Sequence, residues 1–476
     1  MLFQTKNAPG NLKDTWVWFE DGVYYLYNMM MPRKGIYLST SEDGIHFKEH
    51  DLVITGDDQI GSGMIWKGVH FDLDGKYFMS FTQHEHLCLV TKLAESSDLF
   101  TWNRLGPRAE FRPDARWYRV GPFDHRPSYF GPRWDDMQTI PDGNGGLYGF
   151  LTANPRDRSG FGFGRSTNGI DWEALPPPDI EWTQNDVLPW MEVAGVCCTH
   201  DRYYLAVKSS TGSQFMDEYT TRYNLPIPSG IPEISGIWIL TADRPEGPWH
   251  PASRNTRMLT FDARYAHVSF GGFFDGPDGL MFNHEVRYTE SGSNLGNQHL
   301  APFKKVRTAD DGSLHLTYWN GNEKLKGKGP FAIPLREQNG VPAFLSEMMD
   351  TETGAVIQGM LTFGSPGGNR AGIYVQGPDN TGWAVLVARD GTAEYGRMER
   401  ETGYITDPEP VIHRQHQFPL HADFRLLLWD RFIELYIDDM LIQCYSTDAD
   451  PTGRIGLFNA HGLNGQPPEV HYWGMR

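Results

Sequence analysis

A two-part pattern of hydrophobic and polar positions recurs five times along the first two thirds of the chain. Its first part is a turn, often containing Asp and Gly, that leads into a run with alternating aromatic positions, at residues 20–29, 73–82, 144–153, 200–209 and 277–286. Its second part is a small polar turn followed by another such run, at residues 39–47, 95–102, 165–172, 240–249 and 307–316. Alternation with a period of two, bounded by turn residues, predicts antiparallel strands.

The five repeats predict a five-bladed β-propeller over residues 1–320. A unit of about four short strands cannot bury both of its faces alone, whereas several such units arranged radially can. The repeats are spaced more widely than the roughly 40–50 residues usual for one blade, so the additional residues are expected in loops.

A second domain is expected after the last repeat. Residues 321–334 are rich in Gly, Lys and Pro and are predicted to form a linker. Residues 335–476 alternate in strand fashion, with turn residues at intervals of roughly 8–12 positions, which predicts a β-sandwich. A hairpin is expected around Asp438 and Asp439. The fold class is therefore all-β, a five-bladed propeller followed by a sandwich.

Composition and charge narrow the classes of ligand. Of the 476 residues, 39% are hydrophobic and 21% are charged, which is too apolar for a disordered chain. The 42 Lys and Arg residues against 60 Asp and Glu give a net charge of −18, so no basic field attracts nucleic acid or an anionic membrane surface. Neutral ligands such as sugars are compatible with this charge, and the oligomeric state is left open.

Cellular location and redox state are inferred from what the chain lacks. No apolar run approaches the roughly 20 residues that cross a bilayer, and the first residues do not have the pattern of a signal peptide. The chain as given is therefore expected to be cytoplasmic, or secreted where a signal peptide has been removed. The few cysteines are expected to be reduced core thiols: Cys88, Cys197, Cys198 and Cys444.

Three carboxylates occupy comparable positions in the first strands of three predicted blades. Asp14, Asp136 and Glu192 each precede the turn of their repeat. The first strands of a propeller line its central channel, so these side chains are expected to converge on one pocket. Their neighbours are Val, Ile, Met and Trp, among which a carboxylate is costly unless it is paired or used in chemistry. Glycoside cleavage uses one carboxyl as proton donor and another as nucleophile or base.

Further side chains near the same strand starts are candidate substrate-binding residues. Asp135 and His267 are expected in the channel and Arg126, beside Asp124, at its rim, although His267 and Arg126 also have ordinary structural explanations. Tryptophans suit stacking on sugar rings but could equally pack between blades, and five of them lie there: Trp16, Trp18, Trp66, Trp134 and Trp190.

No metal or cofactor is predicted. His84, Glu85 and His86 have the composition of a zinc site, but alternation along a strand puts Glu85 on the face opposite the two histidines. The Gly-rich segments are typical of turns and not of a phosphate-binding loop, and no Gly-x-Ser-x-Gly segment of a serine hydrolase occurs.

On these residues the chain resembles the furanosidase clan of glycoside hydrolase families 32, 68 and 43. In architecture the resemblance covers nearly the whole length, because family 32 combines a five-bladed propeller with a β-sandwich. Four segments carry the motif match. Residues 13–16 keep only the Asp of the clan's blade-1 segment, 66–69 are similar to Trp-Ser-Gly-Ser, 135–137 correspond to Arg-Asp-Pro, and 192–194 keep only the Glu of Glu-Cys-Pro.

The resemblance implies a retaining hydrolase of β-fructofuranosidase type that acts on an oligosaccharide or small glycoside. By that analogy Asp14 attacks the anomeric carbon, Glu192 protonates the leaving oxygen and Asp136 holds sugar hydroxyls in the transition state. The nearest alternative is an arabinofuranosidase or another inverting member of the clan. A retaining reaction needs carboxyls about 5–5.5 Å apart, and an inverting one roughly 6.5–9.5 Å.

Two alternatives lie outside these hydrolases. A non-catalytic carbohydrate-binding propeller is favoured if Asp14 is neutralised by Lys13 or Arg133 and Glu192 is turned into a contact between blades. A phosphorylase would need a cluster of basic side chains in the pocket, for which Arg126, Arg133 and Lys67 are weak candidates.

Overall fold

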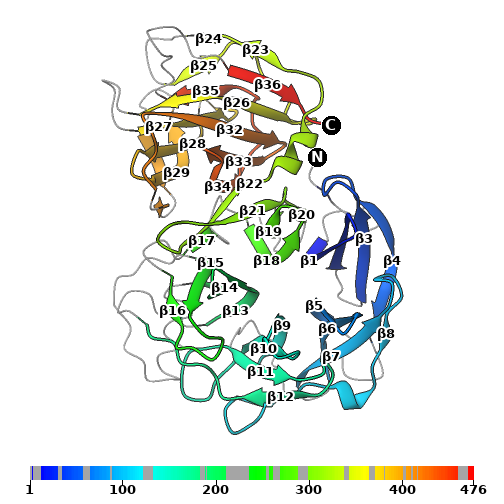
Figure 1. The fold of residues 1–476 in the computed structure, drawn as a ribbon. Coiled ribbons are helices and arrows are strands. Elements are labelled where there is room, and N and C mark those ends of the chain that lie inside the picture. Colours follow the sequence, from blue (N-terminus) through cyan, green and yellow to red (C-terminus); the bar gives the residue numbers. More distant parts are fainter. Residues whose placement is uncertain are drawn as a thin grey trace.

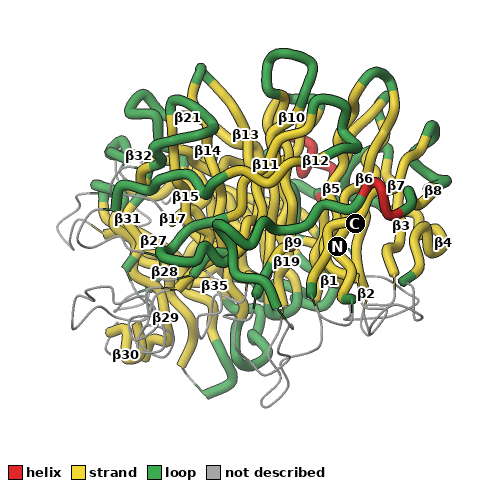
Figure 2. The backbone as a smooth tube through the Cα atoms, turned by 90° about the horizontal axis from the view of Figure 1, so that it is seen from below, coloured by secondary structure: helices red, strands yellow, loops and turns green. Residues whose placement is uncertain are grey.

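A computed structural model describes most of the chain. The described residues are 3, 12–30, 35–56, 65–85, 88–121, 132–182, 188, 190–210, 235–252, 257–260, 268–287, 298–336, 342–363, 370–379, 381–399, 404–408, 411–414, 416–458 and 470–476. Within these ranges strands dominate, joined by loops and by the short 3-10 helices η1 (Pro107–Ala109) and η2 (Asn320–Leu325) (Figure 2). No helix in the described ranges is long and apolar enough to cross a membrane.

The first three blades are four-stranded antiparallel sheets whose strands follow chain order. Blade 1 contains β1 (Leu12–Glu20), β2 (Val23–Met30), β3 (Gly35–Ser41) and β4 (Lys48–Thr55). Blade 2 contains β5 (Ile65–Leu73), β6 (Lys76–His84), β7 (Leu89–Ser96) and β8 (Asn103–Arg104). Blade 3 contains β9 (Trp134–Pro141), β10 (Leu147–Ala153), β11 (Gly162–Ser166) and β12 (Trp172–Leu175).

The last two blades each carry one additional strand. Blade 4 contains β13 (Glu192–Thr199), β14 (Arg202–Ser210), β15 (Ser235–Ala242) and β16 (His250–Pro251), and β17 (Arg257–Thr260) also pairs with β15. Blade 5 contains β18 (Val268–Gly276), β19 (Gly279–Arg287), β21 (Lys304–Thr308) and β22 (Leu314–Tyr318), and β20 (Gln298–Leu300) also pairs with β19. The five sheets form a ring with their first strands innermost (Figure 1), and each first strand contacts the next around the ring, so the predicted five-bladed propeller is confirmed.

The repeated turns explain the repeated sequence pattern. Asp21 and Gly22 both have positive φ, 48° and 81°, as a tight hairpin turn requires. The second turn of the pattern is closed by side chains. In blade 1, Ser41 Oγ accepts from Gly44 N–H at 2.9 Å, and Asp43 Oδ1 accepts from Ile45 N–H at 2.9 Å. Small polar residues recur there because their oxygens replace missing backbone acceptors.

Each first strand also contains a β-bulge near its start. The pairing register shifts between Lys13 and Trp16 in β1, between Trp66 and Gly68 in β5, between Asp135 and Gln138 in β9, between Val193 and Gly195 in β13, and between Val268 and Gly271 in β18. A bulge bends a strand and changes the direction of the side chains beside it. The channel-facing residues at this end therefore depart from simple alternation.

Two packed sheets follow the propeller. The first runs β34 (Met440–Ser446), β33 (Phe432–Ile437), β32 (His421–Trp429), β26 (Ala355–Thr362), β36 (Val470–Gly474) and β23 (Phe331–Ile333). The second runs β24 (Leu335–Arg336), β25 (Ala343–Leu345), β35 (Ile455–Phe458), β27 (Arg370–Gln376), β28 (Thr381–Ala388), β29 (Thr392–Glu399) and β30 (Tyr404–Pro408), with β31 (Ile412–His413) also on β29. A buried apolar cluster contains residues of both sheets. The predicted β-sandwich is confirmed.

The predicted hairpin around Asp438 and Asp439 is confirmed as the β33–β34 connection, and both residues have positive φ. The same strand β34 joins the sandwich to the propeller, because Met440 pairs with Thr317 of β22. The cysteine prediction needs two corrections. All four thiols are free, but Cys88 is only partly buried, and Cys198 is exposed because alternation along β13 turns it away from the buried Cys197.

Candidate active site

The starts of β1, β9 and β13 bring predicted carboxylates together at one end of the channel. Asp14 is partly exposed, whereas Asp136 and Glu192 are buried. Asp14 and Asp136 lie in the bulges of their strands with φ of 50° and 52°, a left-handed conformation that non-Gly residues adopt rarely. The bulges thus point these two carboxylates in directions that a regular strand would not give.

Arg133 is the centre of the cluster. Its Nη2 lies 2.6 Å from Asp135 Oδ2 and 3.4 Å from Asp136 Oδ2, and its Nη1 lies 3.0 Å from Glu192 Oε1. Its Nε lies 2.9 Å from both oxygens of Asp135. A guanidinium presents five donors in one plane, so a single Arg can bridge three carboxylates.

Asp135 is the anchor of this arginine. It has no exposed surface and binds Arg133 through both oxygens. The sequence predicts that Asp135 binds substrate. The structure gives it another position, beneath Arg133, because the bulge turns both Asp135 and Asp136 toward the same guanidinium.

Glu192 has a second cation as partner. Lys208 Nζ lies 3.2 Å from Glu192 Oε2, and the two residues face each other across β13 and β14. Burial alone would raise the pKa of Glu192, but the charges of Lys208 and Arg133 outweigh it and lower the pKa to about 2. Glu192 is therefore ionised at neutral pH.

Asp136 shifts in the opposite direction. Burial and the charge of Asp135 raise the pKa of Asp136 well above its usual range, against the opposing effect of Arg133. The charges of Glu192 and Asp14 add to this effect. Asp136 and Glu192 thus share Arg133 while their pKa values shift in opposite directions.

A threonine links Asp136 to the backbone that follows Glu192. Thr152 Oγ1, on β10, donates to Asp136 Oδ2 at 3.1 Å and accepts from Val193 N–H at 2.7 Å. Val193 directly follows Glu192 and lies beside the bulge of β13. A buried N–H without an acceptor is costly, so Thr152 stabilises the start of β13.

The start of β1 is held in a similar way by blade 5. Glu285 Oε1, on β19, accepts from Thr15 N–H at 2.6 Å. Asn283 Nδ2 donates to Thr15 O at 3.2 Å and to Thr15 Oγ1 at 3.0 Å. Burial, and then the charge of Asp14, raise the pKa of Glu285 to about 7.

The predicted aromatic platforms are mostly packed inside blades. Trp16 is 5% exposed and stacks on Tyr27, with ring centroids 5.8 Å apart. Trp134 is 1% and Trp190 9% exposed. In this state these rings contribute to packing, and their contact with a sugar stays a prediction.

Three predicted binding residues cannot be placed. His267, Arg126 and the side chain of Trp66 lie outside the described residues, as does Asp124.

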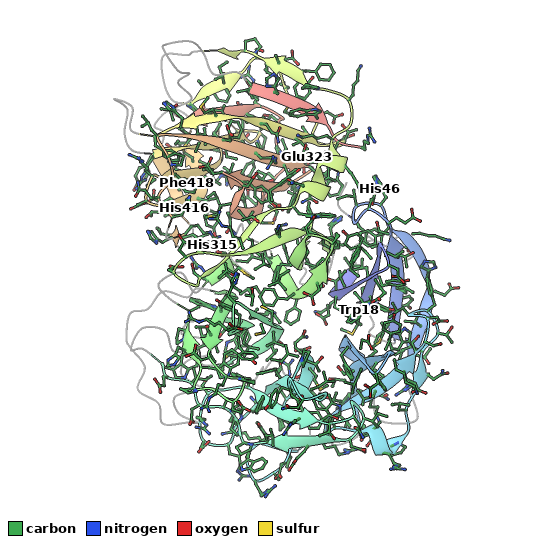
Figure 3. All side chains as sticks on the ribbon, viewed as in Figure 1. Trp18, His46, His315, Glu323, His416 and Phe418 are labelled. Atoms are coloured by element: carbon green, nitrogen blue, oxygen red, sulfur yellow. The ribbon has the colours of Figure 1, made fainter. Side chains whose placement is uncertain are left out.

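A cavity of about 880 Å³ lies at the other end of the first strands. It is lined by residues of several blades, among them Phe19, Gln138, Tyr203 and Asp275. Trp18 also lines it, near the inner edge of blade 1 (Figure 3). The cavity is lined by later residues of β1, β9 and β13, whose first residues form the carboxylate cluster.

Among the described residues, one group has the donor types of a metal site. His284, Glu434 and Cys444 are fully buried between blade 5 and the sandwich, with ligand atoms within 4.8 Å of one another. Lys304 Nζ lies 2.8 Å from Glu434 Oε2. This ammonium already balances the carboxylate charge, so the group is explained as a contact between the two domains. The sequence also contains the zinc-like group of His84, Glu85 and His86. Glu85 pairs with Lys92, and His86 lies outside the described residues.

Sequence reasoning missed Lys208, Thr152 and Glu285. At the turn of this hairpin Thr199 pairs with Arg202. A hairpin without a bulge would therefore pair Glu192 with Ser209, and the bulge moves Lys208 into that position instead. No local signal marks Thr152 or Glu285, because each acts on the neighbouring blade.

Comparisons with known proteins give the fold a precedent. No protein-family model matches the chain, and no curated protein sequence matches it. Solved structures do match. Sucrose-6-phosphate hydrolase from Lactobacillus gasseri is similar with a TM-score of 0.70 and 13% identity, over 98% of this chain and 92% of that chain. The β-fructofuranosidase of Aspergillus kawachii has a TM-score of 0.68 and 12% identity, over 99% of this chain and 93% of that chain.

A third similar structure is that of a member of glycoside hydrolase family 32. The GH32 β-fructofuranosidase of Bombyx mori matches with a TM-score of 0.66 and 11% identity, over 98% of this chain and 92% of that chain. Identities this low establish a shared fold only. The resemblance to glycoside hydrolase family 32, a propeller followed by a sandwich, is thus confirmed in the fold.

Proposed function

We propose that this protein is a glycoside hydrolase that acts on a furanoside, of β-fructofuranosidase type. The observation that carries the proposal is the cluster of Asp14, Asp136 and Glu192 at one end of the channel, in which Arg133 binds Asp136 and Glu192 and the charge of Asp14 acts on Asp136. Neighbouring carboxyls whose environments drive their pKa values apart are the arrangement that glycoside cleavage needs. The three structures reported above are described as hydrolases or fructofuranosidases, which supports the furanoside as substrate.

Within this proposal Asp14 is the nucleophile and Glu192 the acid and base of a retaining reaction. Asp14 is the most exposed of the three carboxylates, so it is the one a sugar reaches first. The pKa of Asp136 is raised and that of Glu192 is lowered, and both carboxyls are bound by Arg133. In the first step Glu192, protonated when the sugar is bound, gives its proton to the leaving oxygen while Asp14 forms a bond to the anomeric carbon. In the second step the ionised Glu192 takes a proton from the water that displaces Asp14. Asp136 and Arg133 orient the sugar hydroxyls.

The test is turnover of a panel of natural and aryl furanosides, fructosides beside arabinosides, by the wild type and Glu192→Gln. We expect turnover of a fructoside that falls by about 10²-fold or more in Glu192→Gln. The loss should be much smaller with an aryl substrate, whose leaving group needs no protonation. Glu394→Gln, at an exposed ion pair with Arg370 in the sandwich, is the matched control and should retain full activity.

The contacts of Glu192 also favour a second function, carbohydrate binding without catalysis. Glu192 is bound by both Arg133 and Lys208, as expected for a carbohydrate-binding propeller whose acid has been neutralised. That alternative replaces the hydrolase if the wild type turns over no furanoside while it still binds sugars in calorimetry, with equal affinity in Glu192→Gln.

A further inference from the structure

The bulge in β1 needs support that β1 and β2 do not provide. Lys13 pairs with Met29 and Trp16 with Tyr27, so Asp14 and Thr15 together face the single residue Asn28. Two residues opposite one leave a gap in the ladder of hydrogen bonds. The left-handed φ of Asp14 adds a conformational cost. This conformation persists only where neighbouring groups hold it.

Those neighbouring groups come from β19 in blade 5. Glu285 Oε1 accepts from Thr15 N–H at 2.6 Å, and Asn283 Nδ2 donates to Thr15 O at 3.2 Å. All three residues are buried, with 0% or 1% exposure. Asn283 and Glu285 are two positions apart, so both project from the same face of β19. The peptide that follows Asp14 is thus held on both its N–H and its carbonyl side.

The same arrangement occurs at the other end of the proposed catalytic cluster. Thr152, on the second strand of blade 3, accepts from Val193 N–H, directly after Glu192 in blade 4. Glu285, on the second strand of blade 5, accepts from Thr15 N–H, directly after Asp14 in blade 1. In a closed ring, blade 5 precedes blade 1. In both places the residue after a proposed catalytic carboxylate is held by the preceding blade.

We propose that Glu285, together with Asn283, is a positioning residue that holds Asp14 in its reactive orientation across the junction of blades 5 and 1. The proposal rests on the proposed function, since it assigns a role to Asp14 as nucleophile. Glu285 does not touch substrate. It acts through Thr15, and a change of its hydrogen bond moves the Asp14 carboxylate. A displacement of about 1 Å in a reacting group can lower turnover about 10²-fold.

Glu285 differs from Thr152 in that it titrates. The charged groups of β1 that act on it are Asp14 and Lys13, while Lys304 of β21 is engaged with Glu434 on the other side of β19. Below neutral pH Glu285 is an uncharged acid that accepts from Thr15 without repelling Asp14. Above neutral pH it becomes a buried anion beside the partly exposed Asp14, which predicts an alkaline limb in the activity profile.

The test compares Glu285→Gln and Glu285→Ala with the wild type on the substrate found for it. Gln keeps an oxygen that can accept from Thr15, and Ala does not. We expect kcat to fall at least tenfold in Glu285→Ala with KM unchanged, and to stay within about threefold of wild type in Glu285→Gln. The alkaline limb near pH 7 should be absent in Glu285→Gln. Equal kcat per folded molecule in all three proteins would overturn the proposal.

A control separates positioning from general loss of packing between blades. Tyr204 OH donates to Gly312 O at 2.8 Å between blades 4 and 5, away from the carboxylates. Tyr204→Phe removes one such bond and should leave kcat unchanged. If Tyr204→Phe lowers kcat as much as Glu285→Ala, loosening of the ring explains the loss and the proposal fails.

A structural measurement keeps the proposal testable if no substrate is found. In a crystal structure of Glu285→Ala we expect Asp14 to leave its left-handed conformation, while Glu285→Gln retains it. An unchanged Asp14 in Glu285→Ala would overturn the positioning role. Absence of turnover in the wild type, with Asp14 displaced in Glu285→Ala, would instead remove the proposed function and leave the positioning contact in place.

Discussion

Glu192 and Glu285 are two buried glutamates beside the starts of inner strands, and they have opposite protonation. Both are desolvated, and desolvation alone raises the pKa of each. Glu192 is bound by the cations Arg133 and Lys208, which lower its pKa to about 2. Glu285 has a backbone N–H as its hydrogen-bond partner and the anion Asp14 nearby, and its pKa is about 7. The number of nearby cations, not the depth of burial, decides the charge.

This difference separates two ways to hold a carboxylate at the start of an inner strand. On the blade 3–4 side, charge is balanced within the cluster, and a neutral threonine holds the backbone. On the blade 5–1 side, the backbone is held by a group that is itself titratable. The first side is expected to be stable over a wide pH range and the second to lose stability as pH rises. The predictions below test each side separately.

The largest effect is expected from Arg133→Met, which removes the guanidinium that binds the buried carboxylates Asp135 and Glu192. Removal of one partner of a buried ion network costs about 3–5 kcal/mol, because the remaining charges are left unpaired. Urea denaturation should show this loss in the free energy of unfolding. Arg370→Met breaks an ion pair in which Arg370 is 51% and Glu394 31% exposed, and should cost less than about 1 kcal/mol. Equal losses in the two variants would contradict the central role of Arg133.

Glu285 should make stability depend on pH in the direction opposite to Glu192. Its pKa is raised from 4.5 in the unfolded chain to about 7. The folded state therefore binds the proton more tightly, and stability is lost as pH rises from 4.5 through 7, by roughly 3 kcal/mol in total. Glu192 has a lowered pKa, so its contribution is present above 4.5 and is lost as pH falls toward 2.

Thermal unfolding of wild type and Glu285→Gln between pH 4.5 and 8 measures the Glu285 contribution. We expect the fall in melting temperature over this range to be much shallower in Glu285→Gln, because the amide does not ionise. A slope identical to wild type would show that Glu285 has an ordinary pKa.

Lys208→Met should bring the pKa of Glu192 closer to that of Glu285. Loss of one of its two cations should raise the pKa of Glu192 by about one unit or more, which corresponds to roughly 1.4 kcal/mol. The midpoint of acid unfolding should shift to higher pH. Lys305→Met removes an exposed lysine of blade 5 and serves as the control. An unchanged acid midpoint in Lys208→Met would assign the lowered pKa to Arg133 alone.

The smallest effect is expected from Thr152, whose hydroxyl carries no charge. Thr152→Val leaves Val193 N–H without its acceptor and should cost about 1 kcal/mol of stability, whereas Thr152→Ser should be close to wild type. Chemical denaturation of both variants measures this difference. If Thr152→Val costs as much as Arg133→Met, the hydrogen bond and not the charge balance supports the blade 3–4 side.

Several features of this protein were predictable from local sequence. The alternation of aromatic and polar residues and the recurring turns predicted the propeller, and turn pairs such as Asp21–Gly22 and Asp438–Asp439 adopt the positive φ that such residues tolerate. The carboxylates Asp14, Asp136 and Glu192 were found because their positions repeat relative to those turns. Each of these inferences depends on residues close together in the chain.

The partners of those carboxylates were decided only by the tertiary structure. Lys208 faces Glu192 because of a one-residue bulge, and a shift of one residue reverses the face on which every following side chain of a strand lies. Thr15 and Glu285 are 270 positions apart and meet only because the ring closes between blades 5 and 1. Local periodicity thus determined which residues enter the channel. Bulges and ring closure determined which charges they meet, and those charges set the protonation on which the proposed chemistry depends.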